Sequence, residues 1–264
     1  MVNIDRSIVS QNFSAAARNY DRWAKPQLEI AKLLRELAPS GAAPERILDV
    51  GCGAGFLTRL LRERYPESQI HGIDLAPGMI ELCRERFQHD ARMDFSIADA
   101  MSWDPDAAYD LTAASCCVQW LGDPADWLPR FRAWLRPDGA MLVSILLPGT
   151  FRELRASYSA VCGETLTGPE LFPEEYHHEA WDAIALKCIE AKRETHVFFY
   201  PSARDVLAYF KKIGVAMSRH PGNSPLPYGR IKRLLEYYTT HFTDAAGNAA
   251  CTYDVLYALL EKPS

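Results

Sequence analysis

A glycine-rich stretch, Asp49–Gly55, directly follows a short apolar segment and could hold a ligand against its main chain. Glycines at Gly51, Gly53 and Gly55 permit positive φ angles and let a ligand approach the backbone closely. Such a turn is expected at the carboxyl edge of a sheet, where open α/β folds bind ligands. Phe56 stands where the dinucleotide fingerprint has its third glycine, which disfavours a nicotinamide dinucleotide.

Three aspartates follow three successive predicted strands. Asp49 could accept a hydrogen bond from a cationic amine of the ligand, directly or through water. Asp74 could hold both ribose hydroxyls of an adenosine, and Asp99 with Ala100 could bind the adenine amine. Because Asp49 would repel a phosphate, the set suits a nucleoside with a positive charge and no phosphates. Each aspartate alone could instead be a helix cap or a turn former, and this alternative is weakest for all three together.

Alternating strand and helix patterns surround these residues and predict an α/β fold. Apolar runs predict strands at 46–50, 70–74, 93–98, 109–115 and 140–147. Helical patterns lie between them at 56–65, 77–87 and 123–135. Further strands are expected at 194–200 and 252–260, with helices at 202–213 and 228–238. This alternation indicates a parallel sheet that is covered by helices on both faces.

We expect a single domain, 1–264, with two helical additions. Residues 1–40 predict an N-terminal helical lid, in which two helices separate near Lys25-Pro26. The pattern changes after Pro148-Gly149, and residues 150–192 are predicted to form a helical insertion after the fifth strand that covers the active site. A separate domain is the alternative, but too few residues remain for another core.

Composition and charge exclude several classes of protein. Hydrophobic residues make up 48% and charged residues 24%, as in ordinary globular proteins. No apolar run is long enough for a membrane helix, and no secretory signal is visible. The net charge of −5 disfavours a general nucleic-acid binder. Seven cysteines without metal-ligand or disulfide spacing favour the cytoplasm, and His177-His178 lacks a third metal ligand, so we expect no metal.

The basic residues are concentrated in one segment. Residues 201–240 hold seven lysines and arginines against Asp205 and Glu236, although the whole chain is acidic. This imbalance indicates either an acidic partner or a solvated helix face.

Residues 47–120 resemble the class I S-adenosylmethionine-dependent methyltransferases. The resemblance lies in Asp49–Gly55, Ile73–Met79, Ala98–Ala100 and Asp110–Trp120. It implies a Rossmann-like, seven-stranded, mostly parallel sheet whose last strand, 252–260, is antiparallel. It also implies S-adenosyl-L-methionine as cofactor, S-adenosyl-L-homocysteine as product and no metal. The cofactor-binding candidates are Asp49, Gly51, Gly53, Gly55, Asp74, Leu75, Met79, Asp99, Ala100 and Ser115.

Other stretches are similar to the malonyl-acyl-carrier-protein O-methyltransferase family, which starts pimelate assembly in biotin biosynthesis. They are Asn12–Asp21 with Ala24 and Gln27, Cys117–Asp123, and segments near the C-terminus. The family usually has asparagine where this chain has Cys116. The resemblance implies methyl transfer to the free carboxylate of a malonyl thioester, carried by an acidic acyl-carrier protein. A carboxylate is ionised at pH 7, so this reaction needs no general base.

Several residues are candidates for acceptor chemistry. Gln119 could hydrogen-bond the acceptor, Trp120 could form a pocket wall or belong to the core, and Tyr20 could close over the cofactor or merely pack between helices. An arginine should hold the malonyl carboxylate, and Arg152 and Arg155 are candidates, although either could be solvated. The expected docking face for the carrier protein consists of Lys211, Lys212, Arg219, Arg230, Lys232 and Arg233.

The sequence is also compatible with two other functions. One is a methyltransferase for another small acid or a quinone precursor, and the other is a non-catalytic protein that binds S-adenosylmethionine. The fourth strand is followed by Ser115–Val118 rather than an Asn/Asp-Pro-Pro-Tyr/Phe motif, which disfavours amino-group acceptors.

Overall fold

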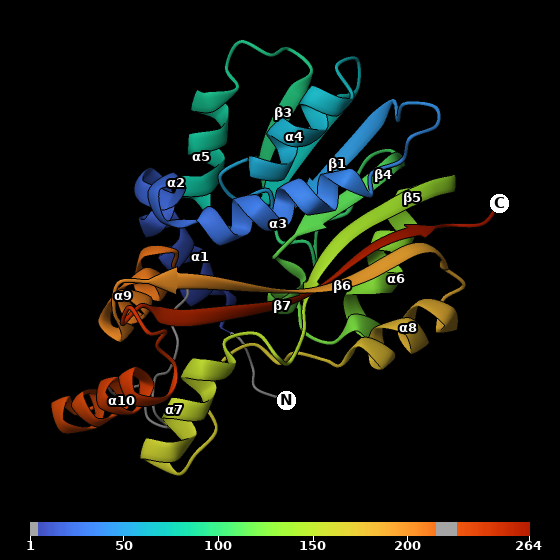
Figure 1. Cartoon of the computed structure of the whole chain (residues 1–264). Coiled ribbons are helices and arrows are strands. Elements are labelled where there is room, and N and C mark those ends of the chain that lie inside the picture. Colours follow the sequence, from blue (N-terminus) through green and yellow to red (C-terminus); the bar gives the residue numbers. More distant parts are fainter. Residues whose placement is uncertain (1–4, 215–225) are drawn as a thin grey trace.

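A seven-stranded sheet in the order β3-β2-β1-β4-β5-β7-β6 forms the centre of the computed structural model, which describes residues 5–214 and 226–264 (Figure 1). Strands β1 to β5 pair in parallel, and β7 lies antiparallel between β5 and β6. The strands are β1 (Arg46–Val50), β2 (Gln69–Asp74), β3 (Met93–Ile97), β4 (Tyr109–Ser115), β5 (Leu135–Leu146), β6 (Lys187–Tyr200) and β7 (Ala249–Glu261). The predicted class I methyltransferase fold with an antiparallel last strand is confirmed.

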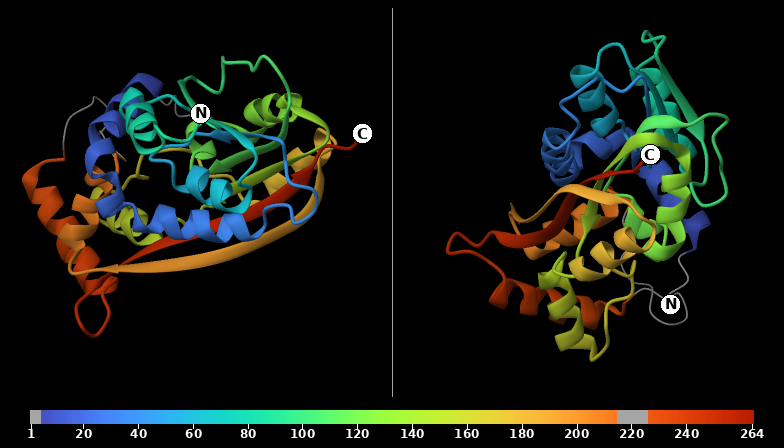
Figure 2. Two further views of the ribbon diagram at one scale, coloured as in Figure 1. Left: turned by 90° about the horizontal axis from the view of Figure 1, so that it is seen from above. Right: turned by 90° about the vertical axis from the view of Figure 1, so that its right-hand side faces the viewer.

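Helices cover both faces of this sheet (Figure 2). They are α3 (Lys25–Glu36), α4 (Phe56–Arg64), α5 (Pro77–Arg86), α6 (Pro124–Trp134), α8 (Glu174–Ala183), α9 (Ala203–Lys212) and α10 (Tyr228–His241). Because successive strand residues face opposite sides, Ile47 joins the core that includes α3 and α4, while Leu48 joins the core that includes α6. No helix of the described residues is long and apolar enough to cross a membrane.

The N-terminal segment is fastened across the carboxyl ends of the first strands. It forms α1 (Arg6–Ala16), a 3₁₀ turn (Ala17–Asn19) and α2 (Tyr20–Trp23) before α3 begins. The Ser10 hydroxyl donates to the Leu75 carbonyl at 2.9 Å, and the Gly78 amide donates to Ser14 Oγ at 3.2 Å. A Cβ at Gly78 would lie only 2.7 Å from the Ser14 carbonyl oxygen, so α1 and α5 approach closely because this residue is glycine.

The prediction of a helical segment as far as residue 192 is wrong at its end. Only α7 (Arg152–Cys162) and α8 are helices there, and β6 already begins at Lys187, which pairs with Glu261. Lys187–Arg193 is exposed at the edge of the sheet and so lacks the apolar alternation of a half-buried strand. The segment Lys187–Arg193 is a strand because it pairs with β7, which is a tertiary contact.

Candidate active site

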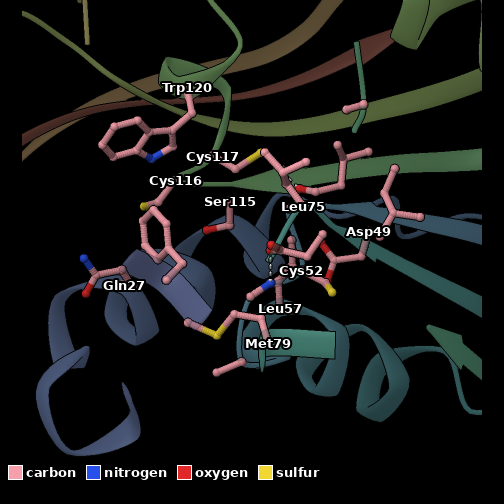
Figure 3. Close-up of a pocket in the computed structure, with 18 of the residues that line it drawn as sticks. Gln27, Asp49, Cys52, Leu57, Leu75, Met79, Ser115, Cys116, Cys117 and Trp120 are labelled. Atoms are coloured by element: carbon pink, nitrogen blue, oxygen red, sulfur yellow. Dashed lines mark hydrogen bonds between the residues drawn. The ribbon is translucent and has the colours of Figure 1, made fainter. Parts of the chain in front are cut away.

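A pocket opens where β1, β2, β3 and β4 end, and the N-terminal helices line its other side (Figure 3). Of the predicted cofactor residues, all except Gly55 line it. They come from four different strand ends, as the sequence predicted for the three aspartates. The lining residues on the N-terminal side are Arg6, Val9, Phe13, Tyr20, Gln27 and Ala31.

The glycine turn after β1 is shaped by two different requirements. Gly51 has φ 65°, and a Cβ there would lie 2.5 Å from Cys117 Cβ, so a side chain would collide with the exit of β4. Gly53 has φ 52°, and a Cβ there would meet no atom closer than 3.9 Å. This turn therefore leaves space beside Gly53 in which a ligand can approach the main chain. Gly55 instead precedes α4 and faces the Phe87 ring.

Asp74 joins the end of β2 to the glycine turn. Its Oδ2 accepts the Gly53 amide at 2.9 Å and its Oδ1 accepts the Ala76 amide at 2.8 Å. Burial raises the pKa of this carboxyl, and the backbone N–H groups oppose that rise. A carboxylate has about four acceptor sites, so each oxygen can also accept one ribose hydroxyl. The geometry fits the nucleoside role expected for Asp74.

Asp49 is a buried carboxyl group at the end of β1, only 1% exposed. Burial raises its pKa to about 7, a hydrogen bond of 2.5 Å from the Thr58 hydroxyl lowers it, and the charge of Asp74 raises it further. A cation in the pocket would favour the ionised form of Asp49. The site is therefore electrostatically suited to a positively charged ligand.

Asp99 has a partner that the sequence did not indicate. Arg6, from α1, forms an ion pair with it at 3.0 Å, and the Met101 amide donates to it at 3.0 Å. Because both Arg6 and Asp99 line the pocket, this pair closes the pocket's edge between β3 and the N-terminal segment. Sequence patterns around Arg6 contain no signal for this contact, which depends on how α1 packs.

A second pocket adjoins the first on the side of α7. Five residues line both pockets, namely Phe13, Tyr20, Gln27, Cys116 and Trp120. The second pocket is also lined by Gln119, Phe151, Arg155, the segment 166–169 and Tyr253. A methyl donor in the first pocket and an acceptor in the second would meet at the five shared residues, which we call the junction.

The predicted catalytic residues lie at or beside this junction. Tyr20 is buried, and its ring centroid lies 6.1 Å from that of Phe56. Trp120 packs edge-on against Phe13, with 5.7 Å between the ring centroids. Burial raises the pKa of Tyr20 above its usual value, so its hydroxyl is protonated at neutral pH. Gln119 donates from Nε2 to the Cys116 carbonyl at 2.7 Å. Its Oε1 is buried and has no hydrogen-bond partner within the described part of the chain.

Cys116, at the position where asparagine is usual in the resembling family, adopts φ 52°. This left-handed conformation is strained for most residues but tolerated by asparagine. Burial raises the pKa of the Cys116 thiol to about 11, while hydrogen bonds to Ser144 and Ser115 lower it. The thiol is thus protonated at neutral pH and does not offer a thiolate nucleophile at the junction.

The two candidate arginines differ in position. Arg155 lines the second pocket, donates from Nε to the Thr150 carbonyl at 3.2 Å, and has no ion pair with another described residue. Burial lowers the pKa of Arg155 from its usual value. Arg152 has a side chain that is 63% exposed, pairs with Glu153 at 3.3 Å and lines neither pocket.

The predicted docking residues lie away from both pockets. Lys211 and Lys212 are exposed in the last turn of α9, and Lys232 and Arg233 are exposed on α10. Arg230 is half-buried on α10, and Arg219 lies outside the described residues. Helices α9 and α10 occupy the same end of the molecule (Figure 1). A groove between them is lined by Leu207, Tyr228, Ile231 and Leu235, by Arg204, and by the ion-paired Lys232 and Glu236.

The adjacent histidines of α8 pack against an aromatic ring. His177 and His178 lie 6.5 Å and 4.5 Å from the Trp181 ring. Across residues 5–214 and 226–264, no group of three or more His, Cys, Asp or Glu side chains is placed to hold a metal ion.

The sheet order, the glycine turn and the strand-end carboxylates define a class I S-adenosylmethionine-dependent methyltransferase. Residues 47–139 match the methyltransferase domain family. A malonyl-[acyl-carrier protein] O-methyltransferase from Hahella chejuensis is 35% identical over 89% of this chain and 84% of its own length. One from Acetivibrio thermocellus is 31% identical over 80% of this chain and 79% of its own length. The chain belongs to the malonyl-[acyl-carrier protein] O-methyltransferase family.

Solved structures agree with this fold. The YcgJ protein from Bacillus subtilis is 17% identical with a TM-score of 0.60, and the match includes 89% of this chain and 99% of that protein. The N-methyltransferase NodS from Bradyrhizobium japonicum, solved with S-adenosylhomocysteine, is 15% identical with a TM-score of 0.55. That match includes 97% of this chain and 99% of NodS. At these identities the similarity establishes the fold.

The raised pKa of Asp49 predicts pH-dependent cofactor binding. Below pH 7 this carboxyl group is mostly protonated, and the cationic amine of S-adenosylhomocysteine binds better to its ionised form. Affinity measured by calorimetry should therefore rise between pH 6 and 7, by up to about tenfold per unit, and level off above pH 7. Asp49→Asn should remove this rise. An equal pH dependence in the variant would contradict the assignment.

Proposed function

We propose that this enzyme transfers the methyl group of S-adenosylmethionine to the free carboxylate of a malonyl thioester on acyl-carrier protein. In this proposal it starts pimelate assembly for biotin in the cytoplasm. The observation that carries the proposal is the position of Arg155. Its side chain lines the pocket next to the cofactor pocket, and it has no ion-pair partner among the described residues. The names of the relatives support the same acceptor.

The reaction requires binding and orientation more than proton transfer. Bound S-adenosylmethionine supplies an electrophilic methyl group on a cationic sulfur. The acceptor carboxylate is ionised at neutral pH, so no residue must remove a proton from it. The protein's task is to hold the two reactants in line and to exclude water. The protonated Tyr20 hydroxyl and Cys116 thiol suit this task, because neither competes as an anionic nucleophile.

Arg155 is suited to bind the carboxylate. A guanidinium group presents donors in a planar fork that matches a carboxylate. In Arg155 the Nε–H is used by the Thr150 carbonyl, which fixes the side chain and leaves the terminal N–H groups for a ligand. Arg152 lacks this position because its charge is compensated by Glu153 outside the pocket. Between the two candidates, the geometry favours Arg155.

Gln119 is better suited to the carrier arm than to the carboxylate. Its amide N–H is engaged by Cys116, and its remaining oxygen can only accept a hydrogen bond. A carboxylate offers no hydrogen to it, whereas the amide groups of a pantetheine arm do. We assign Gln119 to recognition of such an N–H and Trp120 to the wall of the junction.

Two segments would enclose the reactants. Residues 1–40 would act as the lid, since Arg6, Phe13, Tyr20 and Gln27 reach the cofactor pocket from it. In the insertion 150–192, the segment 166–171 contributes Leu166, Thr167, Gly168, Pro169 and Leu171 to the acceptor pocket. Both belong, in this proposal, to the single domain 1–264.

The basic end of the molecule would receive the acidic carrier protein. Lys211 and Lys212 lie on α9, whose Tyr209 reaches the acceptor side from the same helix. The nearby groove adds apolar contact area, including Tyr228, which is 82% exposed. Basic residues around exposed apolar ones fit an acidic protein surface.

Replacing Arg155 tests the proposed acceptor. Arg155→Ala should lower kcat/KM for malonyl-acyl-carrier protein by about 30-fold or more, because a charged hydrogen-bond partner of the carboxylate is lost. Arg152→Gln, the matched control, can still donate to Glu153 and should stay within about twofold. The measurement is initial rate with radiolabelled cofactor. If the two variants lose activity equally, Arg155 does not hold the carboxylate.

Charge reversal on the basic end tests the partner. Lys211→Glu, Lys212→Glu and Arg233→Glu together should raise KM for the carrier-protein substrate and weaken its dependence on salt. The KM for malonyl-CoA should change less, because coenzyme A makes no protein–protein contact. Equal losses with both substrates would refute docking at this surface.

A further inference from the structure

Three polar side chains from distant elements form a closed set of contacts at the junction. Gln27 of α3 has its Nε2 at 3.2 Å from the hydroxyls of both Tyr209 and Tyr253, and its Oε1 at 3.2 Å from that of Tyr209. The two hydroxyl oxygens are 2.5 Å apart. Both tyrosines are buried, on α9 and β7.

With the Gln27 amide oriented as in the structure, one arrangement of hydrogens gives both buried hydroxyls an acceptor within this set. Among these atoms, the Tyr253 hydroxyl can donate only to Tyr209, so the Tyr209 hydroxyl must donate to Gln27 Oε1. Gln27 Nε2 then donates one hydrogen to the Tyr253 oxygen, which closes the ring. Each buried group in the ring donates once and accepts once, as buried polar groups normally do. The reversed amide closes the same ring in the opposite direction, and in both orientations the ring uses only one of the two amide hydrogens.

This ring leaves the second Gln27 amide hydrogen for a ligand. The Tyr209 and Tyr253 oxygens are each 3.2 Å from Nε2 and only 2.5 Å apart, so both lie on the side of one amide N–H and the other N–H points away from them. Gln27 is half-buried and lines both the cofactor pocket and the acceptor pocket, whereas Arg155 lines only the acceptor pocket. The Gln27 side chain therefore lies beside the passage between the two pockets.

We propose that Gln27 donates this hydrogen to one oxygen of the acceptor carboxylate and directs the other oxygen at the methyl group, with Tyr209 and Tyr253 as positioning residues. This assignment rests on the proposed function. The free oxygen forms the new C–O bond with the methyl carbon as the methyl–sulfur bond breaks. The electron pair of that bond goes to sulfur, which leaves neutral S-adenosylhomocysteine, and no proton moves.

A neutral donor suits this position better than a second cation. The carboxylate charge disappears as the ester forms, so strong stabilisation of that charge beside the reacting atom would favour the ground state. An amide fixes direction with a weaker hydrogen bond than a guanidinium group. Arg155 thus accounts for affinity and Gln27 for alignment, and the two should affect different kinetic constants.

The experiment compares the unmodified enzyme with Gln27→Leu, Tyr253→Phe and two controls, using labelled methyl transfer to malonyl-acyl-carrier protein. Tyr238→Phe removes a buried hydroxyl that bonds the Ala250 carbonyl outside both pockets, and Gln69→Leu replaces an exposed glutamine. We expect Gln27→Leu to lower kcat by about 10- to 100-fold. Tyr253→Phe should lower kcat by about three- to tenfold, because the amide loses its fixed direction.

Binding of S-adenosylhomocysteine and the melting temperature separate alignment from structure. We expect Gln27→Leu to bind S-adenosylhomocysteine within about threefold of the unmodified enzyme, with KM for the carrier substrate changed less than kcat. The controls should retain kcat. A Gln27→Leu enzyme with unchanged kcat, or one whose loss merely parallels weaker S-adenosylhomocysteine binding, would overturn the assignment. No methyl transfer by the unmodified enzyme would overturn the proposed function itself.

Discussion

The hydrogen bond between the Asp74 carboxylate and the Gly53 amide, at 2.9 Å, is the contact on which the cofactor site depends. It ties the end of β2 to the turn after β1, and Gly53 can adopt its φ of 52° there without a side chain entering the ligand space. The same carboxylate also accepts the Ala76 amide at the start of α5. One carboxyl group thus fixes two strand ends and a helix start, and it keeps lone pairs for ribose hydroxyls. Desolvation raises the pKa of this carboxyl group, and the backbone donors oppose that rise.

The N-terminal segment and β7 add residues to the site that forms at the ends of the parallel strands. Arg6 reaches Asp99 across the cofactor pocket, and Gln27 reaches Tyr209 and Tyr253 at the junction. The acceptor chemistry therefore combines residues from α3, α9 and β7, which are far apart in sequence. Helix α9 connects two proposed roles, because Tyr209 holds the Gln27 amide while Lys211 and Lys212 lie exposed at the end of the helix. Carrier docking and acceptor alignment would share this helix.

The sequence predicted those features that local rules determine. The boundaries of β1 and β4 match the apolar runs, and the position of Asp74 follows from its place after a strand. The early start of β6 could not be predicted, because Lys187–Arg193 is exposed on both sides and is a strand only through pairing with β7. The Arg6–Asp99 pair and the Gln27 ring join residues whose proximity depends on helix packing, which periodicity does not reveal. Likewise, Arg152 and Arg155 are distinguishable only once α7 is placed.

The central claim is that the methyl group goes to the free carboxylate of a malonyl thioester. Mass spectrometry of the carrier protein after incubation with S-adenosylmethionine tests it most directly, with malonyl-, acetyl- and unloaded carrier protein compared under one condition. The account predicts one added methyl group on malonyl-carrier protein, lost together with the malonyl group when the thioester is cleaved, and none on the other two forms, because only the malonyl group offers a carboxylate to Arg155 and Gln27. Methylation of acetyl-carrier protein, or no methylation of malonyl-carrier protein despite bound cofactor, would contradict it.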